Sequence, residues 1–190
     1  MTMPTLQWAH TVVLIDADYL DERTKEFSAA LEKITGNPIP KADLCHWLDC
    51  VALDGGLRPG TNDIQAVFIH SKSKKQLQHF IPSDFQTDLD GKAFSDNLGE
   101  FTLLSFPIED IVSADDFFNE ALAAWADAKE VERLLVVGNM QTNADKMMKI
   151  CADTDGKAIT LFVLEPDKES TVEQQGLLFS LMSALGVQPE

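Results

Sequence analysis

The chain has 190 residues, of which 45% are hydrophobic and 24% charged, and its formal net charge is −16 at pH 7. This length and composition predict a single folded domain over residues 1–190 and exclude a chain disordered throughout. The strong negative charge repels nucleic-acid phosphates and anionic lipids, so we expect neither nucleic acid nor a membrane as partner. No apolar run approaches the roughly 20 residues that cross a bilayer.

The cysteines and the N-terminal sequence indicate the compartment. Cys45, Cys50 and Cys151 contain no Cys-x-x-Cys pair, and their number is odd, so neither a disulfide framework nor a zinc site is expected. Thiols among apolar neighbours are typical of core packing in a reducing cytosol. The first apolar run is short and no basic region precedes it, so we expect no signal peptide and a cytoplasmic protein.

Hydrophobic periodicity and breaker residues divide the chain into alternating strands and helices. In chain order, the pattern predicts strand 11–16, helix 19–35, helix 41–52, strand 64–70, strand 101–106, helix 114–128, strand 133–137, helix 143–153, strand 158–164 and helix 171–185. The strands are apolar on both faces, which is typical of a parallel sheet covered by helices. The fold class is therefore α/β: a three-layer Rossmann-like domain with a mostly parallel central sheet of about five strands.

Two helix starts carry capping signals. Ser113 and Asp116 fit an acidic variant of the capping box before helix 114–128, and Ser170 with Glu173 fits the box before helix 171–185.

Residues 80–100 show no readable pattern, and we expect a lid, an interaction element or an ordinary loop there.

Two carboxylates, Asp16 and Asp18, follow the first strand at its C-terminal end. Open α/β sheets bind ligands beyond the carboxyl ends of their strands, and a carboxylate there can hold Mg²⁺ or act as a nucleophile. The plainer interpretation is that Asp16 only caps the turn. For Asp18 we favour the role of N-cap of the first helix.

A second acidic group opens the helix after the third strand, with Asp115 and Asp116 in its first turn and Glu120 one turn later. Acidic residues there complement the helix dipole, and this capping role is the favoured interpretation. The alternative is the second half of a metal site, with Asp16 and Asp116 as the ligands if the site is active.

The loop after the fourth strand, Gly138-Asn139-Met140-Gln141, is predicted to face a ligand. Glycine allows close approach of the backbone, so Gly138, Asn139 and Gln141 are the predicted ligand-binding residues. The two amides bring oxygens but no charge, and Mg²⁺ affinity here should be low.

The basic cluster of note contains histidines and lysines that could contact a phosphate. Its members are His70, Lys72, Lys74, Lys75 and His79. We favour the simpler interpretation, which is a solvated, lysine-rich helix start.

Three motifs together carry a resemblance to a known family. The first strand runs into Asp16-Ala17-Asp18-Tyr19-Leu20, Asp115 or Asp116 opens a later helix, and Val137 to Thr142 follow the fourth strand. Over about residues 11–166 the chain resembles the NYN branch of PIN-like nucleases, which carry Asp-x-Asp/Asn-Asn-Leu, an acidic helix start and Ser-Gly-Asp-x-Asp-Phe at these places. The resemblance implies a ribonuclease-like Mg²⁺ site, but Asn139 and Gln141 replace both carboxylates of the last motif.

A second resemblance is to haloacid-dehalogenase-like phosphatases, whose first strand also ends in Asp-x-Asp. It implies Asp16 as nucleophile, Asp18 as acid, Ser71 as the second-motif hydroxyl and one of the following lysines as the motif lysine. The Gly-Thr that normally follows Asp-x-Asp is replaced by Tyr19-Leu20. The chain is also similar in character to bacterial single-domain families with no assigned activity.

These observations predict an NYN/PIN-like protein that is non-catalytic or weakly active. We expect it to bind a protein partner or a small anionic ligand at the C-terminal edge of the sheet, without a cofactor, and a homodimer is compatible with the sequence. The alternative is a Mg²⁺-dependent hydrolase, either a ribonuclease or a phosphatase, with Asp16, Asp18 and Asp116 as catalytic residues.

Overall fold

The computed structural model describes residues 8–109 and 111–187. The strands are β1 (Thr11–Asp16), β2 (Ala42–Asp43), β3 (Asn62–Ser71), β4 (Phe80–Ile81), β5 (Ala93–Asp96), β6 (Gly99–Ile108), β7 (Arg133–Val137), β8 (Ala158–Val163) and β9 (Glu173–Gly176). The helices are α1 (Ala17–Thr35), α2 (Leu44–Asp54), α3 (Ala114–Asp127), α4 (Ala144–Ala152) and α5 (Leu177–Ala184), with a short π-helix, η1 (Phe85–Leu89).

A seven-stranded sheet forms the middle layer, in the order β5-β6-β3-β1-β7-β8-β9. β5 pairs antiparallel with β6, while the other pairings in the sheet are parallel. The parallel strands, numbered along the chain, thus follow the doubly wound order 3-2-1-4-5-6. The predicted three-layer α/β fold is confirmed, and the sheet is larger than the five strands expected because β5 and β9 extend its edges.

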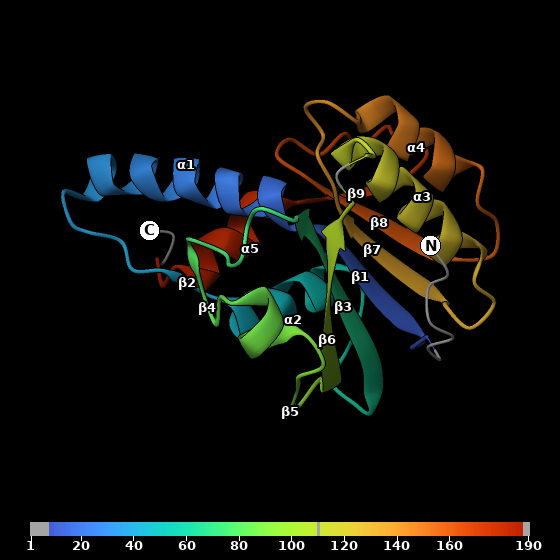
Figure 1. Ribbon diagram of the computed structural model, residues 1–190, viewed down its shortest axis with the longest axis horizontal. Coiled ribbons are helices and arrows are strands. Elements are labelled where there is room, and N and C mark those ends of the chain that lie inside the picture. The colour runs from blue at the N-terminus through green and yellow to red at the C-terminus, as the bar shows by residue number, and fades with distance from the viewer. Residues whose placement is uncertain (1–7, 110, 188–190) are drawn as a thin grey trace.

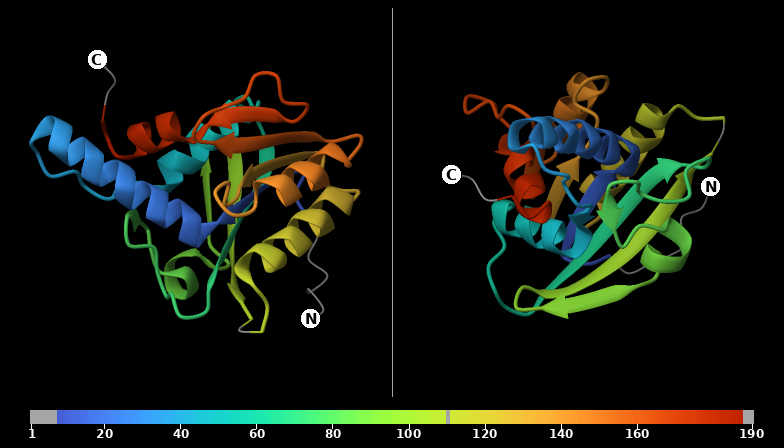
Figure 2. Two further views of the ribbon diagram at one scale, coloured as in Figure 1. Left: turned by 90° about the horizontal axis from the view of Figure 1, so that it is seen from above. Right: turned by 90° about the vertical axis from the view of Figure 1, so that its left-hand side faces the viewer.

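The central strand β1 explains why the domain has two cores. Val12 to Ile15 are fully buried, and their side chains alternate between the two faces of the sheet. Val13 and Ile15 belong to the core under α1, α2 and α5, whereas Val12 and Leu14 belong to the core under α3 and α4. The two helical layers lie on opposite sides of the sheet in Figure 1, and α1 runs well past the sheet in the left view of Figure 2.

The strand order places a topological switch point beside β1. From β1 the chain builds β3 and β6 on one side, and it then crosses over through α3 to place β7 on the other side. The loops that follow β1 and β7 therefore diverge at the carboxyl end of the sheet. Open α/β sheets bind their ligands in the crevice that such divergence creates.

The predicted helix 171–185 is wrong in its first part. Residues Glu173–Gly176 form β9, and α5 begins only at Leu177 with Gly176 as its N-cap. The Ser170 hydroxyl accepts a hydrogen bond from the N–H of Val172 instead of capping a helix. The backbone groups along the free side of β8 need partners, and pairing with β9 outweighs the local capping signal. At α3, by contrast, the Ser113 side chain accepts from the N–H of Asp116 as expected.

The segment between β3 and β6 also differs from expectation. No helix starts at the lysines, because residues 72–79 form turns and extended chain before β4. The buried carboxylate of Asp21 on α1 holds this chain, accepting hydrogen bonds from the N–H groups of Gln78 and His79 at 2.9–3.1 Å. Residues 80–100 are not an irregular loop, since they contain β4, η1 and β5. Phe85 and Leu89 of η1 are buried in the core.

Two further expectations concern helices and thiols. No helix in residues 8–109 and 111–187 combines the length and apolar character that crossing a membrane requires. Cys45, Cys50 and Cys151 are all free thiols, and Cys151 is buried.

Candidate functional site

Asp16 is the last residue of β1 and lies at the switch point. Its Oδ1 accepts a hydrogen bond from the N–H of Tyr19 at 3.1 Å, so Asp16 is the N-cap of α1. Burial raises the pKa of this carboxyl to about 6, and the nearby negative charges of Asp18 and Asp115 act in the same direction. Lys74 opposes the rise. A negative charge on Asp16 is therefore held in a poorly solvated place.

Asp18 is not the N-cap of α1, because the helix begins at Ala17, one residue before it. Its carboxylate turns toward the end of β3, where Oδ2 accepts from both the N–H and the hydroxyl of Ser71. Its other oxygen lies 3.9 Å from Nζ of Lys74. Asp18 thus ties the first turn of α1 to the loop that follows β3.

Of the two aspartates at the start of α3, Asp115 is the one that turns toward the switch point. It interacts electrostatically with Asp16, and its Oδ2 accepts from the Thr142 hydroxyl at 2.8 Å. Asp116 is exposed and lies 3.7 Å from Nζ of Lys146 on α4. The sequence predicted Asp116 as the carboxylate that shares a site with Asp16, but Asp115 is the one that lies near it. The two side chains differ because adjacent residues on a helix point about 100° apart.

The loop after β7 is shaped by its own hydrogen bonds. Oδ1 of Asn139 accepts from the N–H groups of Gln141 and Thr142 at 3.0 and 3.2 Å, which is an Asx-turn. These two bonds use the amide oxygen that a metal would need, since a carbonyl oxygen has two lone pairs. The Gln141 side chain is exposed.

Gly138 has a packing role that the sequence did not reveal. A Cβ at this position would lie 2.2 Å from Sδ of Met147 and 2.9 Å from the Phe118 ring. The glycine therefore lets α3 and α4 pack closely over the end of β7. Its expected role, close approach to a ligand, is not needed to explain it.

The carboxylates at the switch point do not fit a magnesium site as they are placed. The bonds to Ser71 and Thr142 orient Asp18 and Asp115 toward neighbouring loops, and the Asn139 oxygen accepts the two bonds of its turn. Within residues 8–109 and 111–187, no group of three or more His, Cys, Asp or Glu side chains is arranged to hold a metal ion.

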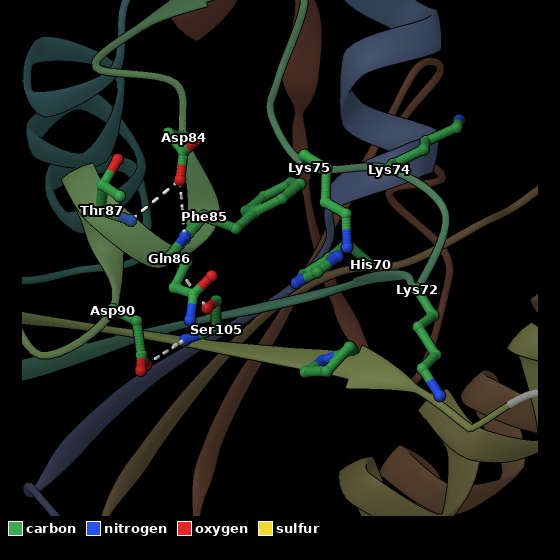
Figure 3. Close-up of a pocket in the computed structure, with 11 residues that line it drawn as sticks. His70, Lys72, Lys74, Lys75, Asp84, Phe85, Gln86, Thr87, Asp90 and Ser105 are labelled. Atoms are coloured by element: carbon green, nitrogen blue, oxygen red, sulfur yellow. Dashed lines mark hydrogen bonds between the residues drawn. The ribbon is translucent and has the colours of Figure 1, made fainter.

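A cavity of about 440 Å³ lies beside these carboxylates, at the carboxyl ends of β3 and β6 (Figure 3). One wall carries Lys72, Lys74 and Lys75 from the loop after β3. The opposite wall comes from η1 and its flanks, and includes Asp84, Gln86, Thr87 and Asp90. The basic cluster of the sequence is therefore part of a cavity wall and not a solvated helix start, although His79 is not among the lining residues.

His70 and Phe85 stack between the two walls, with ring centroids 3.9 Å apart and an interplanar angle of 5°. Nδ1 of His70 lies 2.9 Å from the carbonyl oxygen of Ser71. Since a carbonyl only accepts, Nδ1 carries the proton, and this bond fixes the ring orientation. Lys74 lines the cavity and also pairs with Asp18, so the cavity and the switch-point carboxylates form one continuous polar region.

Sequence reasoning missed the wall formed by η1. Its residues lie in the stretch 80–100, where no periodicity was readable, and a five-residue π-helix has too short a repeat to produce one. The available signal was Asp84 before buried Phe85, a capping residue ahead of an apolar anchor.

The chain was compared with models of protein families, with curated proteins and with solved structures. The model of one protein family, described as "Family of unknown function (DUF6621)", matches residues 5–190. The comparisons with curated proteins and with solved structures each give no match.

Replacing Gly138 by alanine should lower the free energy of unfolding by about 1–3 kcal/mol, because the added methyl group overlaps Met147 and Phe118. Gly60→Ala is the matched control, since the nearest atom to a Cβ there is 3.9 Å away, and it should change stability by less than about 1 kcal/mol. Urea unfolding of both variants measures the difference. Equal stabilities would show that Gly138 is not a packing residue.

Replacing Asp16 by asparagine should stabilise the protein at neutral pH, by on the order of 2 kcal/mol. Asparagine keeps the helix cap but has no charge to bury. Because the folded-state pKa is raised to about 6, the native carboxyl favours folding only below about pH 4, and this advantage is lost as the pH rises to about 6. The stability gap between variant and native protein, from urea unfolding, should therefore be small at pH 4 and full at pH 7. If the difference in unfolding free energy does not change with pH, Asp16 does not carry a buried negative charge at pH 7.

Proposed function

Because the chain belongs to this family of unknown function, we propose its function from the geometry of the site: it binds a small anionic ligand in the cavity at the carboxyl ends of β3 and β6, without catalysis. The observation that carries the proposal is the wall of three lysines, Lys72, Lys74 and Lys75, beside the buried imidazole of His70. The cavity lies at the carboxyl edge of the sheet, and β3, one of its two strands, is the neighbour of β1 at the switch point.

The charge distribution supports an anion in this place. The whole chain carries a net charge of −16, yet three of its 15 lysines and arginines lie within four consecutive positions at one cavity wall. Ammonium groups bind phosphate and carboxylate oxygens through charge-assisted hydrogen bonds. Concave walls focus the local field, so a cationic wall can attract an anion in spite of an acidic surface elsewhere.

The absence of catalysis is proposed from the state of the carboxylates. Asp16 caps α1, Asp18 accepts from Ser71, and Asp115 accepts from Thr142. Each carboxylate thus has a partner that stabilises the fold. A metal-dependent hydrolase would need side chains grouped around its metal, and residues 8–109 and 111–187 contain no such group of three or more His, Cys, Asp or Glu.

Other parts of the proposal have narrower support. The NYN/PIN-like relationship is supported by the electrostatic interaction of Asp16, at the end of β1, with Asp115, in the first turn of α3. A cytoplasmic location is supported by three free thiols, which are typical of a reducing compartment. A protein partner or a second copy of the chain could supply the anionic group as well as a small molecule could.

Inorganic pyrophosphate is the first probe, because it presents a concentrated anionic charge to the lysine wall. Its binding, measured by isothermal titration calorimetry, should weaken about ten-fold in Lys75→Gln, since a hydrogen bond to a charged group is lost. Lys25→Gln removes the same charge from the exposed face of α1 and should leave the affinity unchanged. Added salt should weaken binding to the native protein. If both variants lose affinity equally, the effect is global charge and the cavity is not the site.

Magnesium should give no saturable heat of binding up to millimolar concentration, because residues 8–109 and 111–187 contain no group of three or more His, Cys, Asp or Glu side chains that could hold the ion. The same titration with Asp16→Asn identifies the origin of any heat. Heat that appears with the native protein and disappears in this variant would contradict the proposal and restore the Mg²⁺-dependent hydrolase, to be tested with phosphomonoester and RNA substrates.

A further inference from the structure

We propose that the ligand of this cavity is an aminated phosphomonoester, a small molecule with a phosphate at one end and a protonated amino group at the other. This inference rests on the proposed function and narrows it. The phosphate would contact the lysine wall, and the amino group would contact Asp84 and Asp90 on the opposite wall.

The cavity has room for a ligand larger than a bare anion. Its volume of about 440 Å³ lies within the range of about 300–1,000 Å³ typical of small-molecule sites. A water molecule occupies about 30 Å³ of liquid, so a single phosphate or sulfate would fill only a small part of this space. The space therefore admits a ligand whose body reaches from the lysines toward η1.

The residues on the η1 side of the cavity determine which chemical group the far end of the ligand can carry. In Figure 3 the two aspartates lie on one side of the cavity and the three lysines on the other, with His70 between them. A purely anionic ligand that filled the space would meet the carboxylates of Asp84 and Asp90, which repel it. A ligand with a cationic, hydrogen-bond-donating end matches both walls.

Both carboxylates are fixed in position and remain able to accept further bonds. Oδ1 of Asp84 accepts from the N–H groups of Gln86 and Thr87 at 3.0 and 2.8 Å, and Oδ1 of Asp90 accepts from the N–H of Ser105 at 3.0 Å. A carboxylate has about four lone-pair sites, so these bonds do not exhaust either group. The same bonds from Thr87 lower the pKa of Asp84, which keeps it ionised at neutral pH.

The structural roles of these aspartates do not require their charge. Asp84 is the N-cap of η1, and asparagine caps a helix about as well as aspartate does. Asp90 binds one backbone N–H, which an amide oxygen can also accept. The positive charge of Lys75 already acts on Asp84, so a cationic ligand group chiefly explains the charge of Asp90 and adds to the partners of Asp84. Asp→Asn variants can remove each charge while keeping the fold.

Glucosamine 6-phosphate and glucose 6-phosphate form the matched probe pair, since they differ only in the amino group at one carbon. Calorimetric titrations at slightly acidic pH, where the amine is protonated, should show the amino sugar binding about ten-fold more tightly. Asp84→Asn and Asp90→Asn should each reduce this preference while glucose 6-phosphate binds as tightly as before or more tightly. Asp155→Asn, at an exposed position outside the cavity, should leave the preference unchanged.

The outcomes separate this inference from the proposed function. Pyrophosphate binding that depends on Lys75, without a preference for the amino sugar, would overturn the inference and leave an anion site standing. A preference that survives in both aspartate variants would also overturn it. If neither the sugar phosphates nor pyrophosphate binds, the proposed function and the inference both fail. Far-ultraviolet circular dichroism of the two aspartate variants checks that each remains folded.

Discussion

The structure depends on the burial of β1 on both faces at the centre of the sheet. Four consecutive apolar residues, Val12 to Ile15, anchor the two cores at once, and the strand pairs with β3 on one side and β7 on the other. A strand in this position must end at the switch point, and its last residue must lie at a poorly solvated edge. The raised pKa of Asp16 follows directly from this placement.

The polar groups at the switch point are used mainly to join elements. Asp16 starts α1, Asp18 joins α1 to the end of β3, and Asp115 joins α3 to the loop after β7. Asp21, about one turn after Asp18 on α1, also joins elements, because it holds the chain at residues 78–79. Buried carboxylates that accept backbone N–H groups replace the water that these groups would otherwise bind. The arrangement gives Asp16, Asp18, Asp21 and Asp115 each a structural role that needs no metal.

The cavity exists because the long connection between β3 and β6 folds back over the ends of those strands. Asp21 fixes its first part, Phe85 anchors η1 against His70, and Asp90 fixes its last part to β6. The lysines lie between two of these anchors, so their loop is positioned by neighbours that are themselves buried. Binding residues on a loop held in this way lose less conformational entropy when a ligand arrives.

The sequence by itself determined the α/β class, the five central parallel strands and the position of Asp16, because an apolar run ending in a carboxylate has one stable place in a covered parallel sheet. It could not decide which aspartate of α3 faces β1, since that depends on the rotation of the helix against the sheet. Nor could it find β9, whose pairing is driven by the free side of β8 and not by local propensity. The tertiary structure alone decided that the lysines after β3 face Asp84 and Asp90 across a cavity, because the two walls meet only when η1 packs over the strand ends.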